Sequence, residues 1–197
     1  MSEWADPEPY AALRRLAGEV ADVVGVGKVE VAGGTVVVSL PPVKRHEVAV
    51  WRLWRQLDAQ VGASHPGCIA YSGASVEDPD LGRLRRPDLM VFPAVCLEDE
   101  GTPLRPADVL LAVEIVSWAN PRGDYGEKVA DYAAMGIPHY VIVDPRGGTG
   151  VVHATPGYRH RTPFVFGDTV RVGPWKLDTS VLLTYGPPRA TCGGSAS

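Results

Sequence analysis

The sequence predicts a single α+β domain, close in character to an α/β protein, in which helices flank a central mixed β-sheet. Two near-continuous apolar runs, VLLAVEIV (109–116) and HYVIVD (139–144), enclose a helical segment, DYGEKVADYAAMG (124–136). A strand, a helix and a strand in succession indicate a right-handed crossover and a parallel strand pair that is buried on both faces. The other β-prone runs are short and separated by Gly and Pro turns.

The composition fits one globular domain. The chain has 197 residues, of which 45% are hydrophobic and 21% are charged, and this is the ordinary range for a domain with a sizeable core. The two ends are rich in turn-forming and small residues, so we expect tails at 1–8 and 186–197 and a catalytic domain at 9–185.

Charge and cysteine content limit the functional classes. The net charge of −4 argues against coating of nucleic acid by bulk charge, although bound divalent cations and a local basic patch can still attract a phosphate chain. The cysteines Cys68, Cys96 and Cys192 are far apart and form no CxxC pair, so a reducing cytoplasm is the expected location. No apolar run approaches the ~20 residues that span a membrane, so neither secretion nor membrane insertion is expected.

The remaining elements follow from periodicity. Helices are predicted at 9–24 and 43–62, a hairpin at 28–40 around Gly33 and Gly34, and strands at CIAYSGASV (68–76) and RPDLMVF (86–92). The segment from 151 to 183 alternates β-prone runs with turns. In the second helix His46 falls on the inward side, and the opposite side carries basic residues: Lys44, Arg45, Arg52 and Arg55.

Two carboxylates stand on apolar strands and need partners. Glu114 lies within VLLAVEIVS, and Asp88 precedes LMVF. An ionised carboxylate is rarely buried unless it is paired or binds a metal. If the two strands are neighbours, Asp88 and Glu114 can converge on one hard cation such as Mg²⁺. Lys128, in the following helix, has a stem long enough to carry its ammonium towards them, and this combination suits phosphodiester cleavage. Asp144, before Pro145, is interpreted as a turn residue outside the site.

RRPDLMVF, followed by LAVEIVSWANPRGDYGEKVADYAAMGIPHYVIVDP, resembles the Uma-two family of restriction endonucleases, a branch of the PD-(D/E)xK nuclease superfamily. The resemblance extends from about 29 to 183 and includes VEVAGGTVVVSLPP with a histidine a few residues later. It implies a restriction-endonuclease-like fold. It also implies catalytic roles in the following residues: Asp88 and Glu114 as metal ligands, Lys128 as the catalytic lysine, and Glu30 and His46 in the active-site wall.

One departure from the superfamily pattern matters. The pattern places a lysine two residues after the acid, where this chain has Val116. In this branch Lys128 of the next helix would replace that lysine, which requires its side chain to point towards the carboxylates and not to solvent.

Each candidate also has a simple structural interpretation. Asp88 after Pro87 can be a turn residue, and Glu114 can pair with an arginine at a strand end. Lys128 can be a solvated lysine paired with Asp124 or Asp131. Glu30 can face solvent on an edge strand, and His46 can be a hydrogen-bonded histidine at a helix start. The arginines just before Asp88 can contact phosphate: Arg83, Arg85 and Arg86.

The function predicted from the sequence is a metal-dependent endonuclease that hydrolyses phosphodiester bonds, in DNA rather than RNA, with Mg²⁺ or Mn²⁺ held by Asp88, Glu114 and the main-chain carbonyl of Ile115. A homodimer is expected, since two-fold protein symmetry matches a duplex. Two alternatives stay open: a catalytically inactive nuclease fold that serves as a binding or assembly module, and a hydrolase of a smaller phosphoester. The sequence leaves the recognised DNA sequence and the biological role open.

Overall fold

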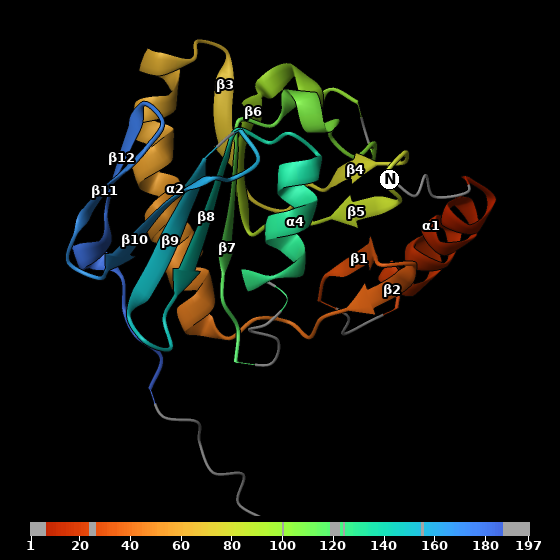
Figure 1. Cartoon of the computed structure of the whole chain (residues 1–197), viewed down its shortest axis with the longest axis horizontal. Coiled ribbons are helices and arrows are strands. Elements are labelled where there is room, and N and C mark those ends of the chain that lie inside the picture. Colours follow the sequence, from red (N-terminus) through yellow and green to blue (C-terminus); the bar gives the residue numbers. More distant parts are fainter. Residues whose placement is uncertain are drawn as a thin grey trace, which may run out of the picture.

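A six-stranded mixed sheet forms the centre of the molecule (Figure 1). The computed structural model describes residues 7–23, 27–99, 101–118, 123, 125–154 and 156–186. The strand order is β10-β9-β8-β7-β6-β3, with bounds β3 Cys68–Tyr71, β6 Leu89–Pro93, β7 Leu111–Ile115, β8 His139–Asp144, β9 Thr149–Ala154 and β10 His160–Val165. Strands β7 and β8 pair parallel, and the other neighbours pair antiparallel. The predicted mixed sheet, with its parallel pair, is confirmed.

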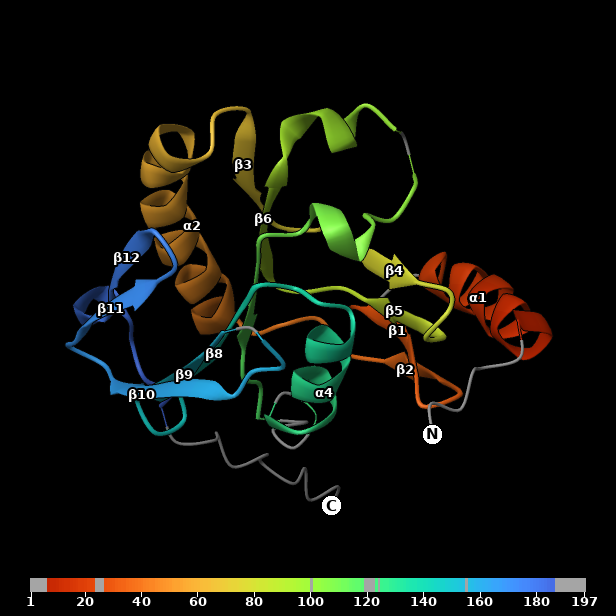
Figure 2. The ribbon, with the colours of Figure 1, turned by 45° about the horizontal axis from the view of Figure 1, so that its top comes forward.

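Helices cover both faces of this sheet. Figure 2 shows the sheet passing between α2 (Lys44–Ser64) and α4 (Glu127–Ala134). Leu53 and Leu57 of α2 pack on one face with Leu111 and Val113 of β7. On the other face, the α4 side, the core cluster contains Tyr132, Met135, Ala112 and Ile142. Because side chains alternate along a strand, the position after Val113 points towards α4.

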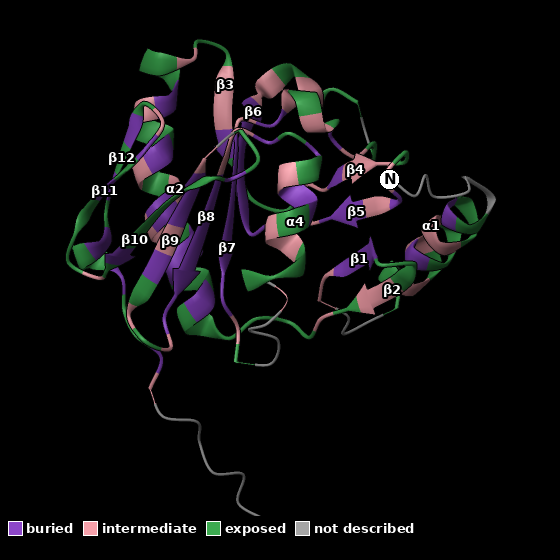
Figure 3. Cartoon of the chain, in the orientation of Figure 1, coloured by how far each residue is buried: buried purple, intermediate pink, exposed green. Residues whose placement is uncertain are grey.

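The central strands are buried on both faces, as Figure 3 shows for β7 and β8. All five residues of β7 are buried, and five of the six residues of β8 are buried. This burial explains why the sequences of β7 and β8 are continuous apolar runs. It also means that the neighbours of Glu114 on its own strand are all buried.

A second, four-stranded antiparallel sheet lies beside the first. Its order is β2-β1-β5-β4, with bounds β1 Val29–Ala32, β2 Thr35–Val38, β4 Val76–Asp78 and β5 Arg83–Arg85. Helix α1 (Pro7–Ala21) packs on it through Tyr10 and Ala17, which contact the cluster around Val31. The predicted hairpin is confirmed.

One strand prediction in this region was wrong in detail, and one strand was not predicted. CIAYSGASV was expected to be one strand, but Cys68–Tyr71 belongs to the large sheet and Val76 begins β4 of the small one. Gly73 between them has a φ of +100°, a left-handed conformation that ends the first strand. Strand β5 escaped prediction because its sequence, RLR, has no apolar pattern; its arginines are held by ion pairs instead.

The C-terminal third closes the domain. Strands β11 (Thr169–Val172) and β12 (Trp175–Asp178) form a hairpin that is bonded to α2 through Gln56 and Gln60. Three short 3₁₀ helices connect elements, at Ala94–Leu97, Pro106–Asp108 and Thr179–Val181. Within the described residues, no helix has the length and apolarity that crossing a bilayer requires.

Helix α4 is shorter than the sequence indicated. It begins at Glu127, and Asp124, the expected N-terminal residue, lies outside the described residues. At the other end Gly136, with a φ of +73°, follows the last turn as expected, because a left-handed residue after the helix suits glycine.

Leu53→Ala tests the α2 side of the core. Leu53 has no exposed surface, whereas Leu40 is 80% exposed. We expect Leu53→Ala to lower the free energy of unfolding by about 2–5 kcal/mol, because burial and contacts are lost together. Leu40→Ala is the matched control and should stay within about 0.5 kcal/mol. Urea unfolding measures both, and equal losses would contradict the assignment of the core.

Candidate active site

The pairing of β6 with β7 brings Asp88 and Glu114 together. Leu89 lies opposite Val113, so Asp88 and Glu114 sit side by side at the end of this ladder. The Asp88 amide donates to the Val113 carbonyl at 3.1 Å, and the Ile115 amide donates to Asp88 Oδ2 at 2.7 Å. The turn interpretation of Asp88 is therefore incomplete, because its carboxylate is bonded directly to the Glu114 strand.

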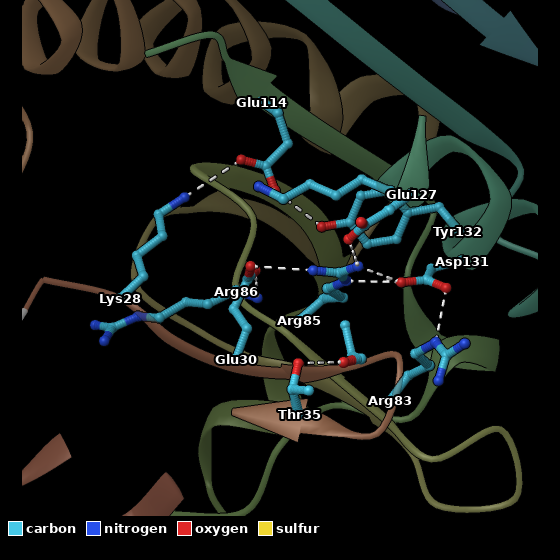
Figure 4. Close-up of polar contacts among 12 residues, drawn as sticks. Lys28, Glu30, Thr35, Arg83, Arg85, Arg86, Glu114, Glu127, Asp131 and Tyr132 are labelled. Carbon is cyan, nitrogen blue, oxygen red and sulfur yellow. Dashed lines mark hydrogen bonds and ion pairs between the residues drawn. The ribbon is translucent and has the colours of Figure 1, made fainter. Parts of the chain in front are cut away.

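One ammonium bridges the two carboxylates. Lys28 Nζ lies 2.6 Å from Asp88 Oδ1 and 3.3 Å from Glu114 Oε2. Asp88 and Glu114 are only 7% and 1% exposed, respectively. Figure 4 shows Lys28 reaching towards Glu114 from the chain that leads into β1. Burial by itself would raise the pKa of Asp88, but Lys28 and His46 lower that pKa far below its usual value.

His46, at the start of α2, contacts Asp88 from the other side. Its Nε2 lies 3.2 Å from Asp88 Oδ2. Burial lowers the pKa of His46, and the hydrogen bond and charge of Asp88 raise it more, so the net shift is upwards. The inward orientation predicted for His46 is confirmed, and it places the imidazole against a candidate ligand.

Helix α4 supplies two groups to Glu114. Lys128 Nζ lies 2.9 Å from Glu114 Oε1, and its side chain is 12% exposed. The Tyr132 hydroxyl, one turn further on, donates to the same oxygen at 2.9 Å. Burial raises the pKa of Tyr132, and the Glu114 charge raises it further, so the phenol stays a donor. Lys128 thus points at Glu114 rather than at solvent.

Glu30 lies in a buried ion network next to these groups (Figure 4). Its carboxylate accepts from the Arg86 amide at 2.8 Å and from Arg85 Nη1 at 3.3 Å. Arg85 also forms an ion pair with Asp131 of α4, donating from Nε at 2.8 Å. Arg83 Nε lies 2.7 Å from the other oxygen of Asp131. The network links β1, β5 and α4, so it fixes the helix that carries Lys128.

This network changes the interpretation of the basic run. Arg83 and Arg85 are engaged with Asp131 and Glu30, so their charges are already compensated within the protein. The Arg86 side chain, by contrast, lines a cavity of about 370 Å³ together with Arg14 of α1. Of the three arginines, Arg86 is therefore the one that borders this cavity.

The sequence did not point to Lys28 or Tyr132, and it pointed to Arg85 and Asp131 only for other contacts: phosphate for Arg85 and Lys128 for Asp131. Lys28 and Tyr132 had usable signals. Lys28 and Glu30 are two residues apart at the start of a strand and so share its face, and Tyr132 follows Lys128 by four residues, one helical turn. The pairing of Arg85 with Asp131 had no signal, because the partners are 46 residues apart.

The residues present fit a hard divalent cation. Asp88 Oδ1 and Glu114 Oε2 already share one cation, the Lys28 ammonium, and Mg²⁺ is commonly held by one or two carboxylates plus substrate phosphate and water. No group of three or more His, Cys, Asp or Glu side chains in the described part of the chain has metal-binding geometry. A cation here would therefore depend on the carboxylate pair. The carbonyl of Ile115, the residue whose amide contacts Asp88, is a further candidate ligand.

Comparison with models of known protein families identifies one matching family. Residues 26–176 match the Uma2 family, described as "Putative restriction endonuclease". The chain belongs to the Uma2 family. No curated protein matches it. The matched span includes all five of the sequence-predicted catalytic residues.

A solved structure shares the fold. It is the crystal structure of a protein from Anabaena variabilis described as a putative nuclease belonging to DUF820, with a TM-score of 0.62, 14% sequence identity, and coverage of 85% of this chain and 93% of the other. The restriction-endonuclease-like fold expected for this Uma2 protein is thereby confirmed. At this identity the likeness concerns the fold alone.

Arg85→Ala tests the ion network. It would leave the buried Asp131 and Glu30 without their shared partner, so we expect the free energy of unfolding to fall by about 3–5 kcal/mol. Arg105→Ala, which removes an exposed pair with Asp108, is the control and should have a much smaller effect. If urea unfolding showed similar changes for both, the network would not stabilise the fold.

The environment of Asp144, a residue outside the site, leads us to expect that the stability of the fold depends on pH in the acid range. Burial raises its pKa, but hydrogen bonds and the charge of Arg146 lower it below the ordinary value. A lowered folded-state pKa contributes stability that is present above about pH 4 and is lost as the pH falls through the folded pKa. The stability difference between the wild type and Asp144→Asn should therefore be largest near neutral pH and shrink in acid. Urea unfolding between pH 7 and 3 measures it, and a constant difference would contradict the assignment.

Proposed function

We propose that this Uma2 protein is an endonuclease that hydrolyses phosphodiester bonds in DNA with Mg²⁺ or Mn²⁺. The observation that carries the proposal is the convergence of Asp88 and Glu114 on one cation position, with Lys128 on the adjoining Glu114 oxygen. Family membership supports the nuclease class, and the described neighbour supports it by fold.

In this proposal Asp88 and Glu114 hold the divalent cation, and the Ile115 carbonyl adds a ligand. When bound, the cation supplies Lewis acidity: it lowers the pKa of a coordinated water and neutralises phosphate charge. Lys128 orients the attacking water or stabilises the charge that develops on the phosphorane, because its ammonium is fixed 2.9 Å from Glu114.

The other predicted residues take supporting roles. His46 holds Asp88 through Oδ2, and Tyr132 holds Glu114 through Oε1, so each carboxylate keeps a fixed orientation. Glu30 acts through Arg85 and the Arg86 amide rather than on the substrate, which makes it a positioning residue. Arg86, beside the cavity, is the candidate for contact with the DNA backbone.

The substrate and the assembly state have separate grounds. DNA as substrate follows from the description of the family, and a homodimer follows from the symmetry of a duplex cut on both strands. We also propose that residues 9–185 form the catalytic domain. Sedimentation with and without duplex DNA tests the dimer.

Glu114→Gln is the direct test of the activity. It keeps the size of the side chain but removes the charge that a divalent cation needs, so cleavage should fall to the level seen with EDTA. The measurement is cleavage of supercoiled plasmid and of linear single-stranded and duplex DNA with Mg²⁺ or Mn²⁺. Glu98→Gln, at an exposed position, is the matched control and should retain wild-type activity.

Two results would contradict the proposal. Unchanged metal-dependent cleavage by Glu114→Gln would remove Glu114 from the mechanism. DNA binding by the wild type, with no cleavage under any of these conditions, would favour the alternative of a nuclease fold that serves as a binding module.

A further inference from the structure

The two carboxylates are arranged in an unusual way around Lys28. Each has one oxygen that is held by groups other than Lys28. Asp88 Oδ2 contacts the Ile115 amide and His46, and Glu114 Oε1 contacts Lys128 and Tyr132. The remaining oxygens, Asp88 Oδ1 and Glu114 Oε2, both contact Lys28 Nζ.

Lys28 thus occupies the place where the two acids can share a cation. An ammonium and a divalent cation would compete for the same oxygen lone pairs, and their positive charges repel strongly at such short range in a buried site. Mg²⁺ requires oxygen ligands at about 2.0–2.1 Å, which leaves no room for a lysine contact on the same two oxygens from the same side.

The backbone of Lys28 is fixed, and its side chain is more exposed than those of the two acids. The Ser39 amide donates to the Lys28 carbonyl at 2.8 Å, and the Gly27 amide donates to the Ser39 carbonyl at 3.0 Å. A Cβ on Gly27 would lie 2.6 Å from the Leu40 backbone, so only glycine permits this close approach. The Lys28 side chain, in contrast, is 22% exposed, whereas the side chains of Asp88 and Glu114, taken without their backbone, are 4% and 2% exposed. Its long flexible stem gives the ammonium a route to water.

We propose that Lys28 is a resident counter-ion that occupies the cation position between Asp88 and Glu114, and that a divalent cation binds only by displacing it. The proposal rests on the proposed function, because it assumes that the cation binds at these two acids. Lys28 would keep the carboxylate pair assembled in the metal-free protein and would weaken the binding of divalent cations at low concentration.

Lys28→Met tests the displacement. Methionine keeps the apolar stem and removes the competing charge, so we expect Mn²⁺ to bind about tenfold more tightly or better, measured by calorimetric titration of the full chain without DNA. Without Mn²⁺ the variant should melt at a lower temperature than the wild type, since two buried acids lose their shared cation. Saturating Mn²⁺ should remove most of that difference by mass action.

Lys128→Met is the matched control for charge alone. Lys128 contacts Glu114 Oε1, outside the shared position, so its loss should tighten Mn²⁺ binding less than the loss of Lys28 does. Lys176→Met, at an exposed position on β12, should leave binding unchanged. If Lys28→Met does not fold, Lys28→Gln is measured in the same way.

The outcomes separate the inference from the proposed function. Equal or weaker Mn²⁺ binding by Lys28→Met, or equal gains in Lys28→Met and Lys128→Met, would overturn the displacement while leaving the metal site in place. Absence of Mn²⁺ binding in the wild type and in every variant would overturn the metal-dependent function, and the inference with it. Binding that is tighter in Lys28→Met and abolished by adding Glu114→Gln would support both.

Discussion

The cost of burying Asp88 and Glu114 governs the local structure. Two ionised carboxylates withdrawn from water cost several kcal/mol each unless cations and donors surround them. Lys28, Lys128 and His46 approach from three different elements, and each supplies a positive or hydrogen-bonding group. The positions of β1, α2 and α4 relative to β6 and β7 are therefore linked through one small cluster.

A neighbouring ion network supports this cluster. Arg85, itself buried, joins Glu30 of β1 to Asp131 of α4, and so connects the small sheet to the helix that presents Lys128 and Tyr132. In the proposed mechanism, Lys128 takes the place of the lysine that the superfamily pattern puts two residues after the acid. Lys128 comes from another element, but the ion network fixes α4, the helix that carries it.

The sequence pointed to residues that the structure brings together where the signal was local, and it missed groups whose partners lie far away along the chain. Asp88, Glu114 and Lys128 could be singled out because an acid on a buried strand is costly and because the order of motifs resembles a known family. Glu30 was predicted for the active-site wall, but its carboxylate is bonded to Arg85 and the Arg86 amide. The catalytic roles of Asp88, Glu114, Lys128 and Glu30 stay predictions until the variants are measured.

By itself the sequence determined the mixed sheet, the parallel β7–β8 pair, the amphipathic helix α2 and the identity of the two acids, because apolar periodicity and buried charge are written in neighbouring residues. Only the tertiary structure decided that Lys28 bridges the acids, that Arg85 pairs with Asp131, and that CIAYSGASV divides between two sheets. The ion pairs join residues that are 46 to 86 positions apart along the chain, and the division of CIAYSGASV depends on which sheet edge each short strand joins. No periodicity along the chain encodes either outcome.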